Sequence, residues 1–255
     1  MDVENRVALI SGGASGLGEA TARRLVSAGA KVLVADLNEE RGKALAKEFP
    51  DRVVFTRCDV TNEEQVAATI ERAITAFQRI EIVVNCAGIG AGGRTIRRDG
   101  PYPLDTFKKV VGVNVIGTFS VLSRAAREMA KNDPDENGCR GVIVNTSSIA
   151  AFDGQIGQVA YSASKGAIVG MTLPIARDLS TVGIRICTIC PGTFDTPLLG
   201  RLAEDIKHAL AAAIPNPRRL GHPDEFARLV EHIVVNPYLN GETIRLDGAL
   251  RMAPK

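Results

Sequence analysis

Short apolar runs alternate with longer amphipathic segments along most of the chain. The runs lie at 7–10, 31–35, 53–55, 82–84, 142–144 and 184–190, and a seventh lies at 242–248. Runs this short and this rich in Val, Ile and Leu are typical of buried parallel strands. Segments between them, such as 39–49, 66–77 and 224–235, carry apolar residues at helical spacing. The alternation predicts an α/β fold in which a parallel seven-stranded sheet has helices on both faces.

The first apolar run leads directly into a glycine cluster. Its sequence is Ser11-Gly12-Gly13-Ala14-Ser15-Gly16-Leu17-Gly18, and helical sequence follows. A strand that turns tightly into a helix brings backbone N–H groups and the positive helix end to a pyrophosphate. The second run ends at Asp36, where a carboxylate accepts from the ribose of NAD and repels the 2′-phosphate of NADP. We therefore expect a single doubly wound Rossmann-type domain over 1–255 that binds NAD.

Three polar residues near the middle of the chain are candidates for acid–base chemistry. Tyr161 and Lys165 are four residues apart in a helical segment, so they share one face. A cation about 4 Å from a phenol lowers its pKa by roughly three units, toward the working pH. Ser148 follows the apolar run 142–144, which places it at the ligand-binding edge of the sheet. We expect its hydroxyl to hold a substrate oxygen.

Ser148 followed by Tyr161-Ser162-Ala163-Ser164-Lys165, together with the glycine cluster, resembles the short-chain dehydrogenase/reductase family over nearly the whole chain. The resemblance implies that Tyr161 exchanges the proton, that Ser148 polarises the carbonyl, and that Lys165 holds the nicotinamide ribose. It also implies that Asn114 passes protons through water to Lys165. The catalytic residues would be Ser148, Tyr161, Lys165 and Asn114, and the substrate would contact Ser148, Gln155, Gln158 and Tyr161.

The same resemblance implies a cofactor site that follows the carboxyl edge of the sheet. Its members would be Gly12, Ser15, Gly16, Leu17, Gly18, Asp36, Asp59, Val60, Asn85, Cys86, Ala87, Gly88, Tyr161, Lys165, Pro191, Gly192, Phe194 and Thr196. Three positions depart from the family pattern: Ser11 replaces a threonine, Cys86 replaces an asparagine, and Asp195 replaces a small residue. For Asp59 a second interpretation stays open, in which its side chain caps the following helix.

Two segments near the predicted edge are candidates for substrate contact. The segment 89–103 lacks periodicity, which predicts a long loop, and it carries Arg94, Arg97 and Arg98. An amphipathic stretch from Leu198 to Ile214 predicts a small helical lid at about 194–220. The loop arginines, with Lys207, Arg218 and Arg219, either contact the phosphates of coenzyme A or are ordinary solvated charges.

The stretches 151–179, 191–199 and 239–252 are the most specific part of the resemblance. Within the family they resemble the enzymes that oxidise (S)-3-hydroxyacyl-CoA to 3-oxoacyl-CoA with NAD, as homotetramers. An uncharged helical stretch at 166–176 also favours a subunit interface. Alternatives are the oxidation of steroids or other secondary alcohols, the reduction of 3-oxoacyl thioesters, and a non-catalytic dinucleotide-binding scaffold subunit. Ser162-x-x-Lys165 also matches a serine acyltransferase pattern, but the Ser-Asp-Asn and Lys-Thr-Gly elements that this chemistry needs are absent from the chain.

The composition of the chain limits which partners and which cellular compartment we expect. The 255 residues include 31 basic and 29 acidic ones, which gives a net charge of +2. A charge so close to zero gives no reason to expect a nucleic-acid partner. No apolar stretch is long enough to span a bilayer, and the acidic start MDVENR leaves no room for a targeting segment. Five cysteines without framework spacing favour a reducing compartment, and three scattered histidines predict no metal site. We expect a cytoplasmic enzyme with a small-molecule substrate.

Overall fold

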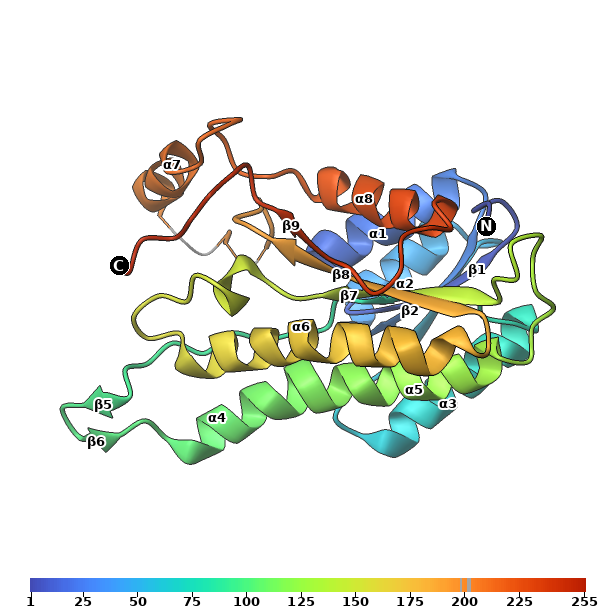
Figure 1. The fold of residues 1–255 in the computed structure, drawn as a ribbon, viewed down its shortest axis with the longest axis horizontal. Helices are drawn as coiled ribbons and strands as arrows, with labels where there is room; N and C mark the ends of the chain where they lie inside the picture. The colour runs from blue at the N-terminus through green and yellow to red at the C-terminus, as the bar shows by residue number, and fades with distance from the viewer. Residues whose placement is uncertain (198, 201–202) are drawn as a thin grey trace.

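A parallel seven-stranded sheet forms the centre of the computed structural model (Figure 1). In spatial order its strands are β3 (Val53–Arg57), β2 (Lys31–Asp36), β1 (Val7–Ser11), β4 (Ile82–Asn85), β7 (Gly141–Thr146), β8 (Ile184–Pro191) and β9 (Thr243–Leu246). The structure describes residues 1–197, 199–200 and 203–255. Leu198, Arg201 and Leu202, which belong to the predicted lid, lie outside the described residues. The predicted sheet, including its edge strand at β9, is confirmed.

Helices cover both faces of the sheet, as predicted (Figure 1). One face carries α1 (Gly16–Ser27), α2 (Glu39–Glu48) and α8 (Pro223–Val235); the other carries α3 (Glu63–Phe77), α4 (Leu104–Val111), α5 (Thr118–Met129) and α6 (Val159–Ser180). Because strand side chains alternate, Ile10 packs into the core under α1 and α8, whereas Leu9 packs into the core under α3 and α5. Both faces of each central strand are therefore buried, which explains the continuous apolar runs.

The order of the strands reverses between β1 and β4, and this creates a switch point at their carboxyl ends. Ser11 lies opposite Asn85, and Asn85 lies opposite Asn145 on β7. The Ser11 hydroxyl donates to Asn85 Oδ1 at 3.1 Å, and Asn85 Nδ2 donates to Asn145 Oδ1 at 2.9 Å. All three side chains are buried, so this polar ladder ties three strands together directly beneath the predicted site.

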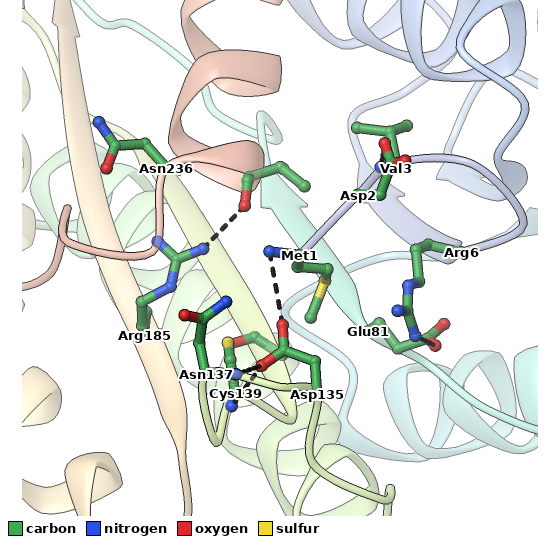
Figure 2. A network of polar contacts seen from close by, with 12 residues as sticks. Met1, Asp2, Val3, Arg6, Glu81, Asp135, Asn137, Cys139, Arg185 and Asn236 are labelled. Carbon is green, nitrogen blue, oxygen red and sulfur yellow. Dashed lines mark hydrogen bonds and ion pairs between the residues drawn. The ribbon is translucent and has the colours of Figure 1, made fainter.

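The opposite edge of the sheet is held by a separate polar network (Figure 2). There the amine of Met1 lies 3.4 Å from a carboxylate oxygen of Asp135, whose other oxygen accepts from the backbone N–H of Cys139 at 2.9 Å. Arg185 on β8 donates to the carbonyls of Ile233 and Val234 in the last turn of α8. A cation at this helix end satisfies carbonyls that have no partner inside the helix.

The predicted loop and the segment after it contain details that the sequence pattern does not predict. The segment 89–103 contains a small antiparallel hairpin, β5 (Ile96–Arg97) with β6 (Gly100–Pro101), which extends from one end of the molecule (Figure 1). After the loop, α4 starts at Leu104 and is followed by a π-helical segment, η1 (Gly112–Gly117), before α5 begins. Such wide turns inside an α-helix often occur at functional sites, and Asn114 lies in this one.

The capping role considered for Asp59 is wrong. Helix α3 begins at Glu63, so Asn62 is its N-cap and accepts from the backbone N–H of Gln65. Asp59 instead accepts from the backbone N–H and the hydroxyl of Thr61, at 2.9 and 2.7 Å, in the turn before the helix. These hydrogen bonds lower the pKa of its carboxyl.

The predicted lid contains one described helix, α7 (Glu204–Ala212), and none of its side chains is buried. In the part of the chain that the structure describes, no helix is both long and apolar enough to cross a membrane. The same residues contain no group of three or more His, Cys, Asp and Glu side chains that is arranged to hold a metal ion.

Candidate active site

The structure brings the predicted catalytic side chains together where β7 leads toward α6. Tyr161 and Lys165 occupy the first turns of α6, and the Lys165 ammonium lies 5.7 Å from the centroid of the Tyr161 ring. Ser148 precedes the short helix η2 (Ile149–Ala151), and its hydroxyl accepts from the Ala150 N–H at 3.1 Å. Burial raises the pKa of the Tyr161 phenol, and the Ser148 hydroxyl is close enough to offset part of that rise. The serine, the phenol and the ammonium thus form one cluster.

The predicted lowering of the Tyr161 pKa by Lys165 is wrong in this structure. Burial raises the pKa of the phenol, and the Ser148 hydroxyl only partly offsets the rise. Burial also lowers the pKa of Lys165 to about 8, from an ordinary value of 10.5. The same cause acts on both groups, because removal from water penalises phenolate and ammonium alike.

Backbone groups of the β7 edge hold Lys165 in place. Its ammonium donates to the carbonyl of Thr146 at 2.8 Å, and the Ser147 hydroxyl donates to the carbonyl of Lys165 at 2.7 Å. The thiol of Cys86 lies 3.4 Å from the Thr146 hydroxyl, and burial raises its pKa to about 11, so it stays neutral. The sequence analysis did not identify Thr146 and Ser147 as part of the site. In both hydrogen bonds the acceptor is a backbone carbonyl, and every residue has one, so the residue type gives no signal.

Asn114 joins three segments of the site. Its Oδ1 accepts from the Ile89 N–H at 2.8 Å, and its Nδ2 donates to the Ile89 carbonyl and to the Ser164 hydroxyl, both at 2.9 Å. A Cβ atom added at Gly88 would lie 3.3 Å from Asn114 Oδ1 and 3.5 Å from Lys165 Nζ. Glycine therefore leaves room between the asparagine and the lysine. The water relay between them stays a prediction.

The glycine cluster has the close backbone packing that a pyrophosphate cradle requires. Gly12 has φ +68°, and a Cβ there would lie 2.6 Å from the Ala87 nitrogen; a Cβ at Gly18 would overlap the carbonyl of Gly12. Ser15 is the N-cap of α1, but its side chain makes no capping hydrogen bond. The first N–H groups of α1, including that of Leu17, thus lack a capping side chain and suit an anion.

The other predicted cofactor residues lie along the same edge. Asp36 ends β2, and its Oδ2 accepts from the Ala14 N–H at 3.0 Å, which puts this carboxylate against the glycine cluster. A Cβ at Gly16 would lie 3.5 Å from the Thr196 side chain, so the segment after β8 also reaches this cluster. The remaining members follow strand ends: Asp59 and Val60 after β3, Asn85, Cys86 and Ala87 at β4, and Pro191, Gly192 and Phe194 at β8. The Phe194 side chain is buried in the core.

Gln155 and Gln158 contact each other rather than pointing apart. Gln158 Oε1 accepts from the Gln155 backbone N–H at 3.1 Å, and the Gln155 side chain donates to the Ala253 carbonyl at 2.9 Å. Both line a hollow of about 360 Å³ between the long loop and the start of α6, together with Arg94 and Ser162. Their contact with substrate stays a prediction.

A nucleotide cradle beside a serine, a tyrosine and a lysine on a doubly wound sheet defines a class of oxidoreductase. A family model described as short chain dehydrogenase matches residues 6–207, and the chain belongs to this family. Membership implies a nicotinamide dinucleotide cofactor.

The chain is also similar over its full length to individual members of this family. The chain is 54% identical to a 3-hydroxyacyl-CoA dehydrogenase type-2 of Drosophila melanogaster, over 99% of this chain and 100% of that protein. It is 52% identical to the human protein of the same description, over 99% and 97%. A crystal structure of a 3-hydroxyacyl-CoA dehydrogenase type-2 from Mycobacterium avium superposes with a TM-score of 0.95, at 46% identity and 98% coverage of both chains.

Proposed function

We propose that the protein oxidises (S)-3-hydroxyacyl-CoA to 3-oxoacyl-CoA with NAD, reversibly. The full-length similarity to the relatives described above is the observation that carries this proposal. The clustering of Ser148, Tyr161 and Lys165 beyond the carboxyl end of β7 supports it, because this edge of the sheet is where a doubly wound fold binds its ligands.

In this proposal Tyr161 exchanges the proton of the substrate hydroxyl, and Ser148 holds the substrate oxygen by a hydrogen bond. The nicotinamide, when bound, supplies the acceptor for hydride. Because burial raises the pKa of Tyr161, the phenol holds its proton at neutral pH, which suits proton donation in the reduction direction. Oxidation needs the phenolate, so its rate should increase with pH.

The residues that would hold the cofactor are also those that would select it. The glycine cluster would bind the pyrophosphate through backbone N–H groups, and Asp36 would bind the adenosine ribose. The Asp36 carboxylate would repel the negatively charged 2′-phosphate of NADP, which NAD lacks. We therefore propose a preference for NAD over NADP.

Asp36→Ala tests the cofactor preference. We expect the ratio of kcat/KM for NAD to that for NADP to fall about tenfold or more, since one unfavourable charge pair is removed. Steady-state kinetics with both cofactors measure the ratio. A higher kcat/KM with NADP in the unaltered protein would contradict the preference itself.

Among the charges proposed to meet the phosphates of coenzyme A, several are already paired. Arg97 contacts Asp99 at 2.8 Å, Lys207 contacts Glu204 at 2.7 Å, and Arg219 contacts Glu225 at 2.8 Å. Arg94, Arg98 and Arg218 make no ion pair within the described part of the chain. Arg94 also lines the hollow next to Gln155 and Gln158. We therefore assign the phosphate contact first to Arg94.

We also propose a homotetramer in the cytoplasm. Ile116, Phe119 and Leu173 expose 61%, 52% and 46% of their surface on η1, α5 and α6, although all three are large apolar side chains. Large apolar side chains exposed on elements that contact each other are expected to be covered in a subunit interface. All five cysteines are free, which suits a reducing compartment.

A panel of substrates tests the function. It contains (S)-3-hydroxyacyl-CoA of several chain lengths, the same acyl groups on pantetheine, sterols, simple secondary alcohols, and 3-oxoacyl thioesters for the reverse reaction. We expect the highest kcat/KM with the coenzyme A thioesters. Faster oxidation of a sterol or another alcohol would favour a sister activity. Dinucleotide binding without turnover of any substrate would favour a scaffold subunit.

A further inference from the structure

Arg245, on the edge strand β9, uses its guanidinium to join three separate segments. It donates to both carboxylate oxygens of Asp153, to Asp247 Oδ2 at 2.7 Å and to the carbonyl of Leu250 at 2.9 Å. The guanidinium also lies 5.4 Å from the centroid of the Phe152 ring. The three charged side chains are only 7–21% exposed, so their interactions are less screened than those of a surface pair.

Asp153 belongs to the loop 152–158, which connects η2 and Ser148 with the first turn of α6. The loop carries Gln155 and Gln158. On one side it contacts the long loop, where the Gly93 N–H donates to the Gly157 carbonyl at 2.8 Å. On the other side it contacts residues 250–254, where the Ile156 N–H donates to the Pro254 carbonyl at 3.0 Å. Figure 1 shows these elements at the same end of the molecule.

We propose that Arg245 is a positioning residue for substrate binding: it holds the loop 152–158 through Asp153, and residues 250–254 through Leu250, so that Gln155 and Gln158 are in place before substrate arrives. This inference rests on the proposed function. A bidentate arginine–carboxylate pair fixes both distance and orientation. Ordering the loop in advance removes part of the entropic cost of binding, so the loss of Arg245 acts mainly on KM.

We call the contacts of Arg245 with Asp153 and Leu250 the Arg245 clamp. The position of residues 250–252 does not depend on this clamp alone. Ile149, Ile214 and Leu250 form a separate buried apolar cluster, against which Leu220 and Met252 pack. This cluster holds residues 250–252 near η2 even when the guanidinium is removed. A variant at Arg245 should therefore fold with a looser loop 152–158.

The test compares Arg245→Met and Asp153→Asn, singly and together, with Arg251→Met as the matched control. Arg251 also contacts Asp247, at 3.1 Å, but it is 61% exposed and, among the described residues, makes no hydrogen bond or ion pair with Asp153. The measurements are kcat and KM for (S)-3-hydroxybutyryl-CoA, the Kd of NADH, and hydrogen exchange of loop 152–158. Arg245→Lys, which keeps the charge but loses the planar fork, serves as the conservative variant.

We expect Arg245→Met and Asp153→Asn each to raise KM about tenfold, with kcat and the NADH Kd changed less than about threefold. The double variant should raise KM no more than Arg245→Met alone, because the contact with Asp153 is already lost in that variant. Arg245→Lys should raise KM less than Arg245→Met does. The KM of Arg251→Met should stay near that of the unaltered protein.

An unchanged KM in Asp153→Asn, or additive effects in the double variant, would overturn the role of Arg245. A kcat loss without a KM change would also overturn it. If the unaltered protein oxidises no 3-hydroxyacyl-CoA, the proposed function fails, whereas the clamp is then tested by hydrogen exchange and by KM for whichever alcohol the panel identifies. Unchanged exchange of loop 152–158 in both single variants would overturn the clamp independently of substrate.

Discussion

The two sides of the candidate site are built in different ways. On the cofactor side, glycines bring backbone against backbone: Gly12 packs on Ala87, and Gly18 packs on Gly12. On the substrate side, the loop 152–158 is joined to strand β9 by two long charged side chains, Asp153 and Arg245. Close backbone packing tolerates no added atom, whereas a clamp made of side chains can loosen without breaking the fold. Changes on the cofactor side should therefore be severe, and changes on the substrate side graded.

The largest effect is expected at the centre, between the two sides. Tyr161→Phe removes the only hydroxyl that the proposal uses for proton exchange, and it should lower kcat about a thousandfold or more. KM and the NADH Kd should change little, because the ring that packs beside Lys165 is kept. Steady-state kinetics together with a binding titration measure this. Near-normal turnover would remove Tyr161 from the chemistry.

Gly18→Ala tests the cofactor side. The new Cβ would overlap the Gly12 carbonyl, so the cradle must shift. We expect a loss of about 1–3 kcal/mol in the free energy of unfolding and at least tenfold weaker NADH binding. Gly90→Ala is the matched control, since a Cβ there meets no atom within 4 Å. Equal NADH affinity in the two variants would show that the cradle is less tightly packed than proposed.

Lys165→Met tests how burial of the Lys165 ammonium affects the free energy of unfolding, apart from its effect on activity. Burial lowers the Lys165 pKa from 10.5 to about 8, so between these values the unfolded chain binds more protons than the folded protein. The free energy of unfolding of the unaltered protein should therefore increase with pH across this window, by about 3 kcal/mol at most. The methionine variant lacks this contribution, so its stability relative to the unaltered protein should fall from pH 7 to pH 10.

Urea unfolding of both proteins at pH 7, 8, 9 and 10 measures the Lys165 contribution, because groups common to both cancel in the difference. Activity should be lost in Lys165→Met at every pH. A constant stability difference across the series would mean that the lysine is not desolvated as the structure indicates.

The smallest effect is expected on the substrate side. Arg94→Gln should raise KM for (S)-3-hydroxyacyl-CoA about threefold at low salt, and the effect should fade as salt is added. Substrates truncated to pantetheine should show no change, since they lack the phosphates. Arg97→Gln on the same loop should change KM less, because Arg97 already pairs with Asp99. An equal effect on truncated substrate would argue against a phosphate contact.

Much of the fold was predictable because its signals are local. Buried strands require continuous apolar runs, and the glycine cluster and the Tyr161–Lys165 spacing lie within single segments. The hairpin β5–β6 escaped prediction, since strands of two residues carry too little pattern.

The sequence by itself determined the sheet, the position of its ligand-binding edge and the three side chains that meet there, because periodicity and spacing place them through local geometry. Only the tertiary structure decided what surrounds them. The Thr146 carbonyl that holds Lys165, the burial that raises the Tyr161 pKa, and the pairing of Arg245 with Asp153 across 92 positions all depend on packing between distant segments. Desolvation and long-range pairing are properties of the folded chain as a whole, and no local pattern of residues encodes them.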